Sequence, residues 1–267
     1  MQHWIEQTAL PMTVPAPYSP FHLLFSLIGI LLAVFFAYIF SRHLQKKQLK
    51  ILLFFCGILL AFSEVYKQLF LYYVVGQGCY DWWYFPFQLC SLPMYLCLIL
   101  PFLHSVPVCQ TICTFMQDFG LLGGIMALAE PTGLLQPYWF LTLHGLSWHI
   151  MLVFISLLIC LGDLSQSGSS SYLHTLPMLA IFCIIATIIN LATGGRADMF
   201  YIAPYYPVTQ IIFHFISIHC GIAVGIMLYL ISICIGGFLC HAVLEKEKQL
   251  YVRKRIKGKG GAGPSKS

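Results

Sequence analysis

Residues 21–40 read FHLLFSLIGILLAVFFAYIF, an apolar run of 20 positions without an Asp, Glu, Lys or Arg. A basic segment follows directly, SRHLQKKQLK at residues 41–50. About 20 apolar residues are enough to cross the hydrocarbon core of a bilayer as a helix. The two stretches together predict a membrane-spanning helix that ends in cations at the water interface.

The composition of the whole chain agrees with this interpretation. Of 267 residues, 59% are hydrophobic and 9% are charged, whereas a soluble domain carries about 25% charged residues. Too little charge remains for a water-facing surface, which excludes a soluble globular enzyme and a disordered chain. Twelve of the 14 Lys and Arg residues lie in two segments, 42–50 and 246–266. Such clusters are typical of membrane flanks, so we expect no nucleic-acid partner.

Similar apolar runs recur along the chain and predict an all-α, polytopic membrane bundle of about seven transmembrane helices. Their ranges are 22–40, 51–75, 84–103, 108–129, 138–162, 173–193 and 216–243. Cytoplasmic loops are enriched in Lys and Arg, so the loop from Arg42 to Lys50 should be cytoplasmic and the N-terminus should lie outside. Seven crossings return the basic C-terminus to the cytoplasm. We therefore expect a multi-pass protein of the cell membrane.

The predicted domain organisation has three parts. They are an extracytoplasmic lead-in at 1–20, a single transmembrane helical domain at 21–243 and a mobile, basic cytoplasmic tail at 244–267. The last uncharged run, 208–243, would rise ~54 Å as one helix, which exceeds the ~30 Å hydrocarbon core. We expect a break near His219 to Gly221, with residues 207–216 lying at the outer interface or re-entering the membrane.

Four polar residues lie within the predicted spans. Glu64 and Lys67 are three positions apart, so they can pair on one helix face. A charge in the bilayer costs at least a few kcal/mol and usually faces a bundle interior or a wet cavity. Asp118 and Asn190 add polar groups to the fourth and sixth spans. The four are either structural or line a substrate-binding site or transport pathway.

The 11 cysteines and ten histidines predict neither a disulfide framework nor a metal site. Cys109 and Cys113 are one helical turn apart, but no second pair completes a zinc site. His144 and His149 project about 140° apart around a helix, so they cannot both face one metal ion as an i,i+4 pair does. We expect no metal and no cofactor.

The third predicted span opens with PFQLCSLP at residues 86–93. Pro93 has no N–H to donate to the carbonyl of Leu89, so a kink and a free backbone acceptor are expected there. This kink places Cys90 at a disrupted turn.

A cysteine beside a histidine forms an activated nucleophile, because the imidazole takes the thiol proton. Cys90 is flanked by Gln88 and Ser91, and the fifth predicted span supplies His144 and His149. A buried cysteine that only packs is the alternative interpretation.

The order of these features resembles the YwaF-like family of bacterial integral membrane proteins. The resemblance covers most of residues 18–240. It rests on YSPFH at 18–22, PFQLCS at 86–91, the stretch 123–131 from a Gly-Gly pair to a proline, a histidine in the fifth span and the stretch 190–204. One departure stands out, because this chain reads Ala197-Asp198-Met199 where relatives typically carry Asn-Tyr-Met.

The bacterial family is similar to a eukaryotic family of transmembrane acyltransferases that remodel ether phospholipids through a cysteine and a histidine. The resemblance implies Cys90 as the nucleophile, a membrane phospholipid as the substrate and His149 or His144 as the base. Distances from the fourth-span proline and from the inner end of the fifth span favour His149, whereas depth matching with Cys90 favours His144.

In such a mechanism, Gln88, Ser91 or backbone amides near the kink would stabilise the oxyanion. Two other functions stay open. One is a transporter or small-ligand binder with a polar interior, and the other is a membrane scaffold without chemistry.

Overall fold

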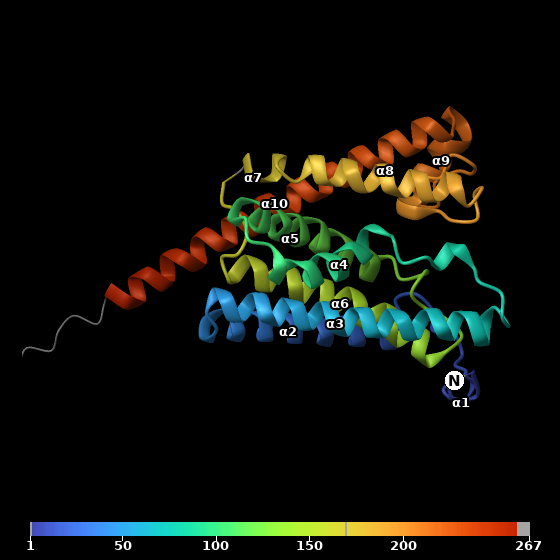
Figure 1. Ribbon diagram of the computed structural model, residues 1–267, viewed down its shortest axis with the longest axis horizontal. Helices are drawn as coiled ribbons and strands as arrows, with labels where there is room; N and C mark the ends of the chain where they lie inside the picture. The colour runs from blue at the N-terminus through green and yellow to red at the C-terminus, as the bar shows by residue number, and fades with distance from the viewer. Residues whose placement is uncertain (1, 169, 261–267) are drawn as a thin grey trace, which may run out of the picture.

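The computed structural model describes residues 2–168 and 170–260, with side chains up to residue 249. The described residues form ten α-helices and no strand. The helices are α1 (Gln2–Gln7), α2 (Pro20–His43), α3 (Lys46–Phe70), α4 (Leu92–Ile99), α5 (Val106–Ala129), α6 (Trp139–Leu161), α7 (Ser170–Leu173), α8 (Leu176–Ala192), α9 (Ile211–Cys220) and α10 (Ile222–Gly260). Short π or 3₁₀ turns lie at Leu71–Val75, Trp82–Tyr84, Leu89–Ser91, Leu100–Phe102 and Met199–Tyr201. The predicted all-α bundle is confirmed (Figure 1).

Proline marks the start of several helices. It occupies one of the first two positions in α2, α4, α5 and α8, as Pro20, Pro93, Pro107 and Pro177. The first N–H groups of a helix have no intrahelical partner, so proline loses nothing there, and its fixed φ suits the first turn. Local sequence chemistry therefore sets these helix boundaries.

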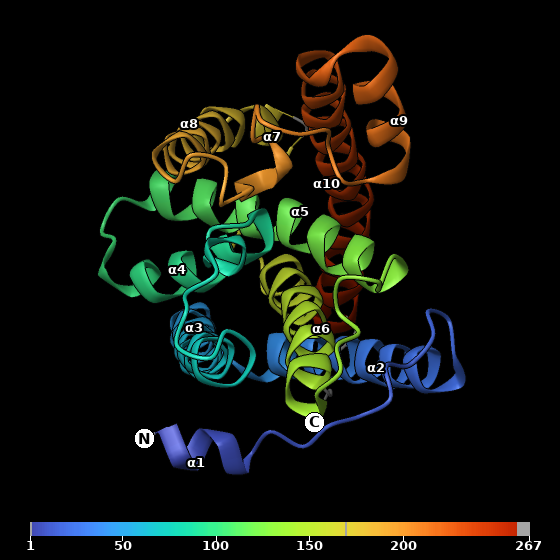
Figure 2. The same cartoon turned by 90° about the vertical axis from the view of Figure 1, so that its right-hand side faces the viewer.

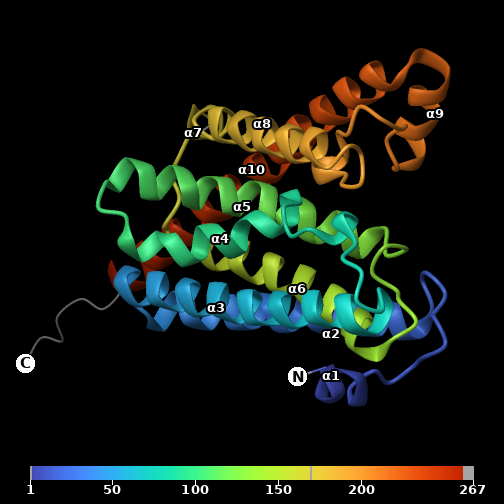
Figure 3. The ribbon, with the colours of Figure 1, turned by 45° about the vertical axis from the view of Figure 1, so that its right-hand side comes forward.

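Among the described residues, six helices are long and apolar enough to cross a membrane, and they correspond to six of the predicted spans. The exception is the third predicted span, 84–103, where the apolar helical stretch is only Leu89–Phe102. Proline at 86, 93 and 101 interrupts the backbone ladder and breaks this span into short turns around α4. The segment still runs along the bundle between α3 and α5 (Figure 3).

The expectation for Pro93 needs one correction. Pro93 does not kink a long helix, because it lies in the first turn of α4, which follows the 3₁₀ turn Leu89–Ser91. Cys90 is therefore in a separate turn before α4. This turn gives the cysteine a backbone environment that a continuous helix would not provide.

Helices α5 and α6 form the centre of the bundle. In the view along the bundle, the other long helices surround them (Figure 2). In α5, two thirds of the apolar 18-residue stretch that is long enough to cross a membrane is buried inside the bundle, against 17% in α2. The outer helices instead expose large apolar side chains such as Leu31 and Phe35 on α2 and Ile184 on α8. That pattern suits helices whose outer faces contact lipid rather than water.

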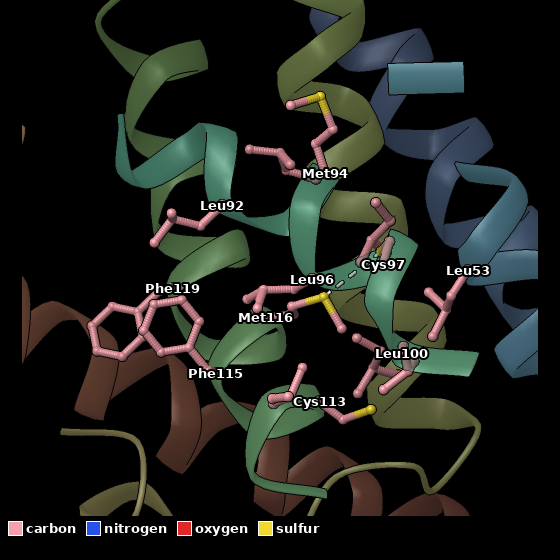
Figure 4. Close-up of a cluster of buried hydrophobic side chains, with 14 of the residues drawn as sticks. Leu53, Leu92, Met94, Leu96, Cys97, Leu100, Cys113, Phe115, Met116 and Phe119 are labelled. Carbon is pink, nitrogen blue, oxygen red and sulfur yellow. Dashed lines mark hydrogen bonds between the residues drawn. The ribbon is translucent and has the colours of Figure 1, made fainter. Parts of the chain in front are cut away.

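The largest buried cluster joins α4 to α5 (Figure 4). Cys97 on α4 and Met116 on α5 place their sulfur atoms 3.7 Å apart, and neither side chain is exposed. Phe115 and Phe119 of α5 pack with ring centroids 4.8 Å apart. Because this side of α4 is fully packed, the short helix is fixed against the centre of the bundle.

The long run at 208–243 is broken where we expect it to be. Helix α9 ends at Cys220, Gly221 has φ +99°, and α10 begins at Ile222. A positive φ is readily adopted by glycine and costs an L residue energy. Ser217 of α9 then lies directly against Gly225 of α10, which leaves no room for a side chain at residue 225.

The last helix extends beyond the predicted boundary at residue 243. Helix α10 runs to Gly260, and residues 261–267 lie outside the described residues. Its Lys248 forms an ion pair with Asp163 (2.9 Å), and Lys46 at the start of α3 pairs with the same carboxylate (2.7 Å). The first part of the predicted tail is therefore a helix anchored to the bundle, whereas a mobile end stays a prediction.

Candidate functional site

Cys90 is half-buried in the turn before α4 and lies against both central helices. Its carbonyl accepts a hydrogen bond from the indole N–H of Trp148 on α6 (3.0 Å). On the other side lies Gly123 of α5, where an added Cβ would stand 3.8 Å from the Cys90 Cβ. Cys90 is thus bonded to α6 through its backbone and lies beside Gly123 of α5.

The two candidate histidines lie on α6 in different environments. Nδ1 of His149 is 2.7 Å from the carbonyl of Gly145. Because a carbonyl only accepts, Nδ1 carries the proton in the neutral ring and Nε2 is left as the basic nitrogen. His144 stacks near Trp148, with ring centroids 5.3 Å apart, and its Nε2 lies 3.9 Å from Glu64.

Glu64 and Lys67 pair as the sequence predicts. Their charged atoms are 2.8 Å apart, and the Glu64 side chain is almost fully buried. Gln68 donates its amide N–H both to Glu64 (2.7 Å) and to the carbonyl of Tyr84 (2.7 Å). The bond to Tyr84 ties α3 to the segment that leads to Cys90.

These side chains lie within one electrostatic neighbourhood. Cys90 interacts with the charges of Lys67 and Glu64, and both His144 and His149 interact with the charge of Lys67. In the described part of the chain, however, the Cys90 sulfur makes no hydrogen bond with either imidazole. A thiol and two imidazoles are therefore gathered near a buried ion pair, without direct thiol–imidazole contact.

Gln88 and Asn190, two predicted substrate-binding residues, both hold the turn Met199–Tyr201. Gln88 donates to the carbonyl of Asp198 (2.7 Å) and accepts from the N–H of Phe200 (2.7 Å). Asn190 donates to the carbonyl of Met199 and accepts from its N–H, at 3.0 and 2.7 Å. Both side-chain amides are thus engaged with backbone, and Gln88 ties this turn to the segment beside Cys90.

Asp198 begins that turn and is 2% exposed. Burial raises the pKa of its carboxyl to about 6, and the hydrogen bond from the Ala203 N–H (2.9 Å) opposes that rise only in part. Phe200 follows with φ +58°, and the side-chain amides of Gln88 and Asn190 hold the turn in this conformation. The segment 197–199, where this chain differs from the YwaF-like pattern, therefore leads into a tightly held turn that Gln88 ties to the Cys90 segment.

Asp118 belongs to a separate network. Its carboxylate lies 2.9 Å from Nδ1 of His241 on α10 and accepts from Gln117 at 3.0 Å. It thus does not share partners with Glu64 and Lys67, nor with Asn190. The four polar residues proposed for one pathway fall into three hydrogen-bond networks. Ser91, the remaining candidate, is buried at the start of α4.

Sequence reasoning missed three residues of these networks. Trp148 and Gln68 bind across helices to residues 58 and 16 positions away, and no local pattern reveals such contacts. His241 carried a usable signal, because an ionisable residue inside an apolar run needs a partner. Among the described residues, no group of three or more His, Cys, Asp and Glu side chains is arranged to hold a metal ion.

The long apolar helices, with large apolar side chains exposed on their outer faces, define a polytopic α-helical membrane protein. The TMEM164 family model matches residues 17–235, which covers most of the chain and all of the candidate site. The chain belongs to the TMEM164 family. Comparisons with curated proteins and with solved structures found no match. The resemblance to the YwaF-like family stays a prediction.

Proposed function

We propose that this protein is a membrane acyltransferase that uses Cys90 as its nucleophile, with membrane phospholipid as the acyl donor. The observation that carries the proposal is that Cys90 lies beside Gly123 of α5 and is bonded to Trp148 of α6, the helix that also carries His144 and His149. A thiol close to an imidazole in a bilayer-embedded bundle is suited to attack on a lipid ester.

His149 is the proposed base. Its Nδ1 is bonded to the Gly145 carbonyl, which directs the basic Nε2 away from the α6 backbone. The sulfur attacks the ester carbonyl carbon as its proton passes to Nε2. The acyl C–O bond then breaks, and the departing lipid alkoxide takes that proton. An acceptor hydroxyl next attacks the thioester, loses its proton to the same nitrogen and restores the thiolate, which regains that proton.

His144 is the second candidate for the base. It shares a helix face with Trp148, whose indole reaches Cys90, and it lies 3.9 Å from Glu64, which would orient or charge its ring. In this arrangement the Glu64–Lys67 pair acts through the histidine. We place the protein in the cell membrane, since the substrate and the helical bundle share that environment.

The test is acyl transfer by the purified chain in phospholipid vesicles. A diacyl phospholipid with an isotope-labelled acyl chain serves as donor, and a lysophospholipid serves as acceptor. Cys90→Ala should abolish transfer, whereas Cys183→Ser, which alters another half-buried cysteine, should leave it intact. Transfer that persists in Cys90→Ala would overturn the proposal, and a protein inactive in every form would favour a transporter or scaffold.

The same assay separates the histidines. Loss of a general base typically lowers rates by about 10²–10⁴-fold. His149→Gln should show that loss together with slower formation of a hydroxylamine-sensitive acyl adduct on Cys90, and His144→Gln should show a smaller effect. The reverse order of effects would assign the base to His144.

A further inference from the structure

A second constellation of reactive groups lies away from Cys90. Nδ1 of His241 on α10 is 2.9 Å from a carboxylate oxygen of Asp118 on α5. Its other nitrogen, Nε2, is 3.3 Å from the hydroxyl of Ser171 on α7. All three side chains are at least 98% buried. A serine, a histidine and an aspartate are thus connected in series from three different helices.

The order of the atoms is that of an acyl-transfer triad. Asp118 accepts from Nδ1–H. Nε2 lies 3.3 Å from the Ser171 hydroxyl and 3.3 Å from the Gly168 carbonyl. In the neutral ring Nε2 carries no proton and can accept the one from Ser171. The Ser171 hydroxyl also lies 2.6 Å from the carbonyl of Gly168. Rotation about the Cβ–Oγ bond moves the hydroxyl proton from that carbonyl to Nε2, so no backbone movement is needed.

Ser171 lines a polar pocket of about 510 Å³. Its lining includes Gln110, Gln166 and His174, and it is bounded by the Lys46–Asp163 ion pair. A pocket of this volume is within the range that holds small organic ligands. Helix α7 lies at the end of the bundle opposite the turns that precede α4 (Figure 1), so this pocket is separate from the Cys90 neighbourhood.

We propose that Ser171, His241 and Asp118 form a second catalytic site, a serine esterase centre that cleaves a carboxylic ester with a polar head. The polar lining receives the head, and the side-chain amides of Gln110 and Gln166 offer donors to the ester carbonyl oxygen. This activity does not depend on Cys90, so it stands or falls separately from the acyltransferase.

The reaction balances with water as the only co-substrate. Ser171 Oγ bonds to the ester carbonyl carbon while its proton passes to His241 Nε2. The bond from that carbon to the alcohol oxygen breaks, and the alcohol leaves with the proton. Water then attacks the acyl-serine, gives a proton to Nε2 and releases the carboxylic acid, and the proton returns to Ser171. Asp118 stabilises the positive imidazolium in both steps.

An alkyl fluorophosphonate probe tests the proposal on the full-length protein in detergent micelles. It phosphonylates a serine only when that hydroxyl is activated. Mass spectrometry of the labelled wild-type protein should locate the adduct on Ser171. Labelling should fall at least tenfold in Ser171→Ala and His241→Gln. It should persist in Ser105→Ala, which alters an exposed serine outside the pocket, and in Cys90→Ala.

Hydrolysis of a p-nitrophenyl acyl ester should follow the same order among the variants. Because the adduct is mapped on the unaltered protein, misfolding of a variant cannot imitate a positive result. Absence of an adduct on wild-type Ser171, or labelling unchanged in folded Ser171→Ala, would show that the three residues only hold α5, α7 and α10 together.

Discussion

At the residue scale, buried polar groups in this protein are held by specific partners. Asn190 and Gln88 bind backbone, and Glu64 binds a cation and an amide. An unpaired polar group inside an apolar interior is costly, so each of these side chains constrains the helix that it contacts. The candidate site is thus built from side chains that also stabilise the bundle.

The Glu64–Lys67 pair leads to a charge-reversal prediction. Removing one partner of a buried pair leaves an uncompensated charge and costs about 3–5 kcal/mol. Glu64→Lys and Lys67→Glu should each lower expression and melting temperature in detergent. The double reversal should recover a large part of both, although Gln68 loses its carboxylate partner. Recovery no better than either single variant would show that the pair is not what stabilises this region.

Asp198 leads to a prediction about pH. Its folded-state pKa of about 6 lies above the unfolded value of about 3.9. The folded state therefore binds this proton more tightly, and its stability falls as the pH rises from about 4 to about 6. Asp198→Asn lacks this loss, so above pH 7 it should melt about 5 °C higher than wild type, with the gap closing near pH 4. A gap that is constant across that pH range would contradict this assignment.

At the element scale, the close contact of α5 with α6 decides the geometry around Cys90. A Cβ at Gly124 would lie 2.9 Å from the His149 carbonyl and from a Val153 methyl. The neighbouring Gly123 is less crowded, since its nearest contact is the Cys90 Cβ at 3.8 Å. The two glycines thus have different structural roles although they are adjacent.

Gly124→Ala should push α6 away from α5. Overpacking of this kind costs about 1–3 kcal/mol, so the melting temperature in detergent should fall and acyl transfer should fall with it. Gly123→Ala is the matched control for stability, and its melting temperature should stay near that of wild type. Equal destabilisation by both substitutions would mean that the contact at Gly124 does not set the distance between α5 and α6.

At the scale of the whole molecule, the chain runs back and forth along the bundle, with α4 completing one passage as a short, broken segment (Figure 3). Asp163 ties the start of α3 to α10 through Lys46 and Lys248. Burial alone would raise the pKa of this carboxyl, but the two ammonium groups outweigh it and hold the pKa below its ordinary value. At the end of the bundle with the basic loop, these ion pairs therefore hold α3 and α10 together.

The orientation in the membrane is a prediction at this scale. Cys79 is exposed in the loop after α3, which should lie outside the cell if the basic loop is cytoplasmic. A membrane-impermeant maleimide applied to intact cells should label Cys79 in a Cys220→Ser protein and lose that labelling when Cys79→Ser is added. A cysteine introduced at Lys47 should react only after the cells are permeabilised. Labelling at residue 47 in intact cells would show that the basic loop lies outside the cell, which is the reverse of the predicted topology.

Features that depend on neighbouring residues were predictable from the sequence. The spans follow from the length of each apolar run, because a bilayer requires every backbone polar group to be satisfied within its own helix. The Glu64–Lys67 pair follows from helical spacing, and the break at Gly221 follows from the excess length of the last run. The third span was predicted less well, since its prolines produced separate turns where one kinked helix was expected.

Contacts between distant residues were decided only by the tertiary structure. Trp148 reaches the Cys90 carbonyl, Gln88 reaches Phe200, and His241 joins Asp118 to Ser171. These partners are between 58 and 123 positions apart, and no period or motif in the chain encodes their pairing. The length of an apolar run determines that a helix crosses the membrane, but the rotation and depth of each helix are set by packing against its neighbours. Those two quantities decide which thiol, imidazole or carboxylate shares a site.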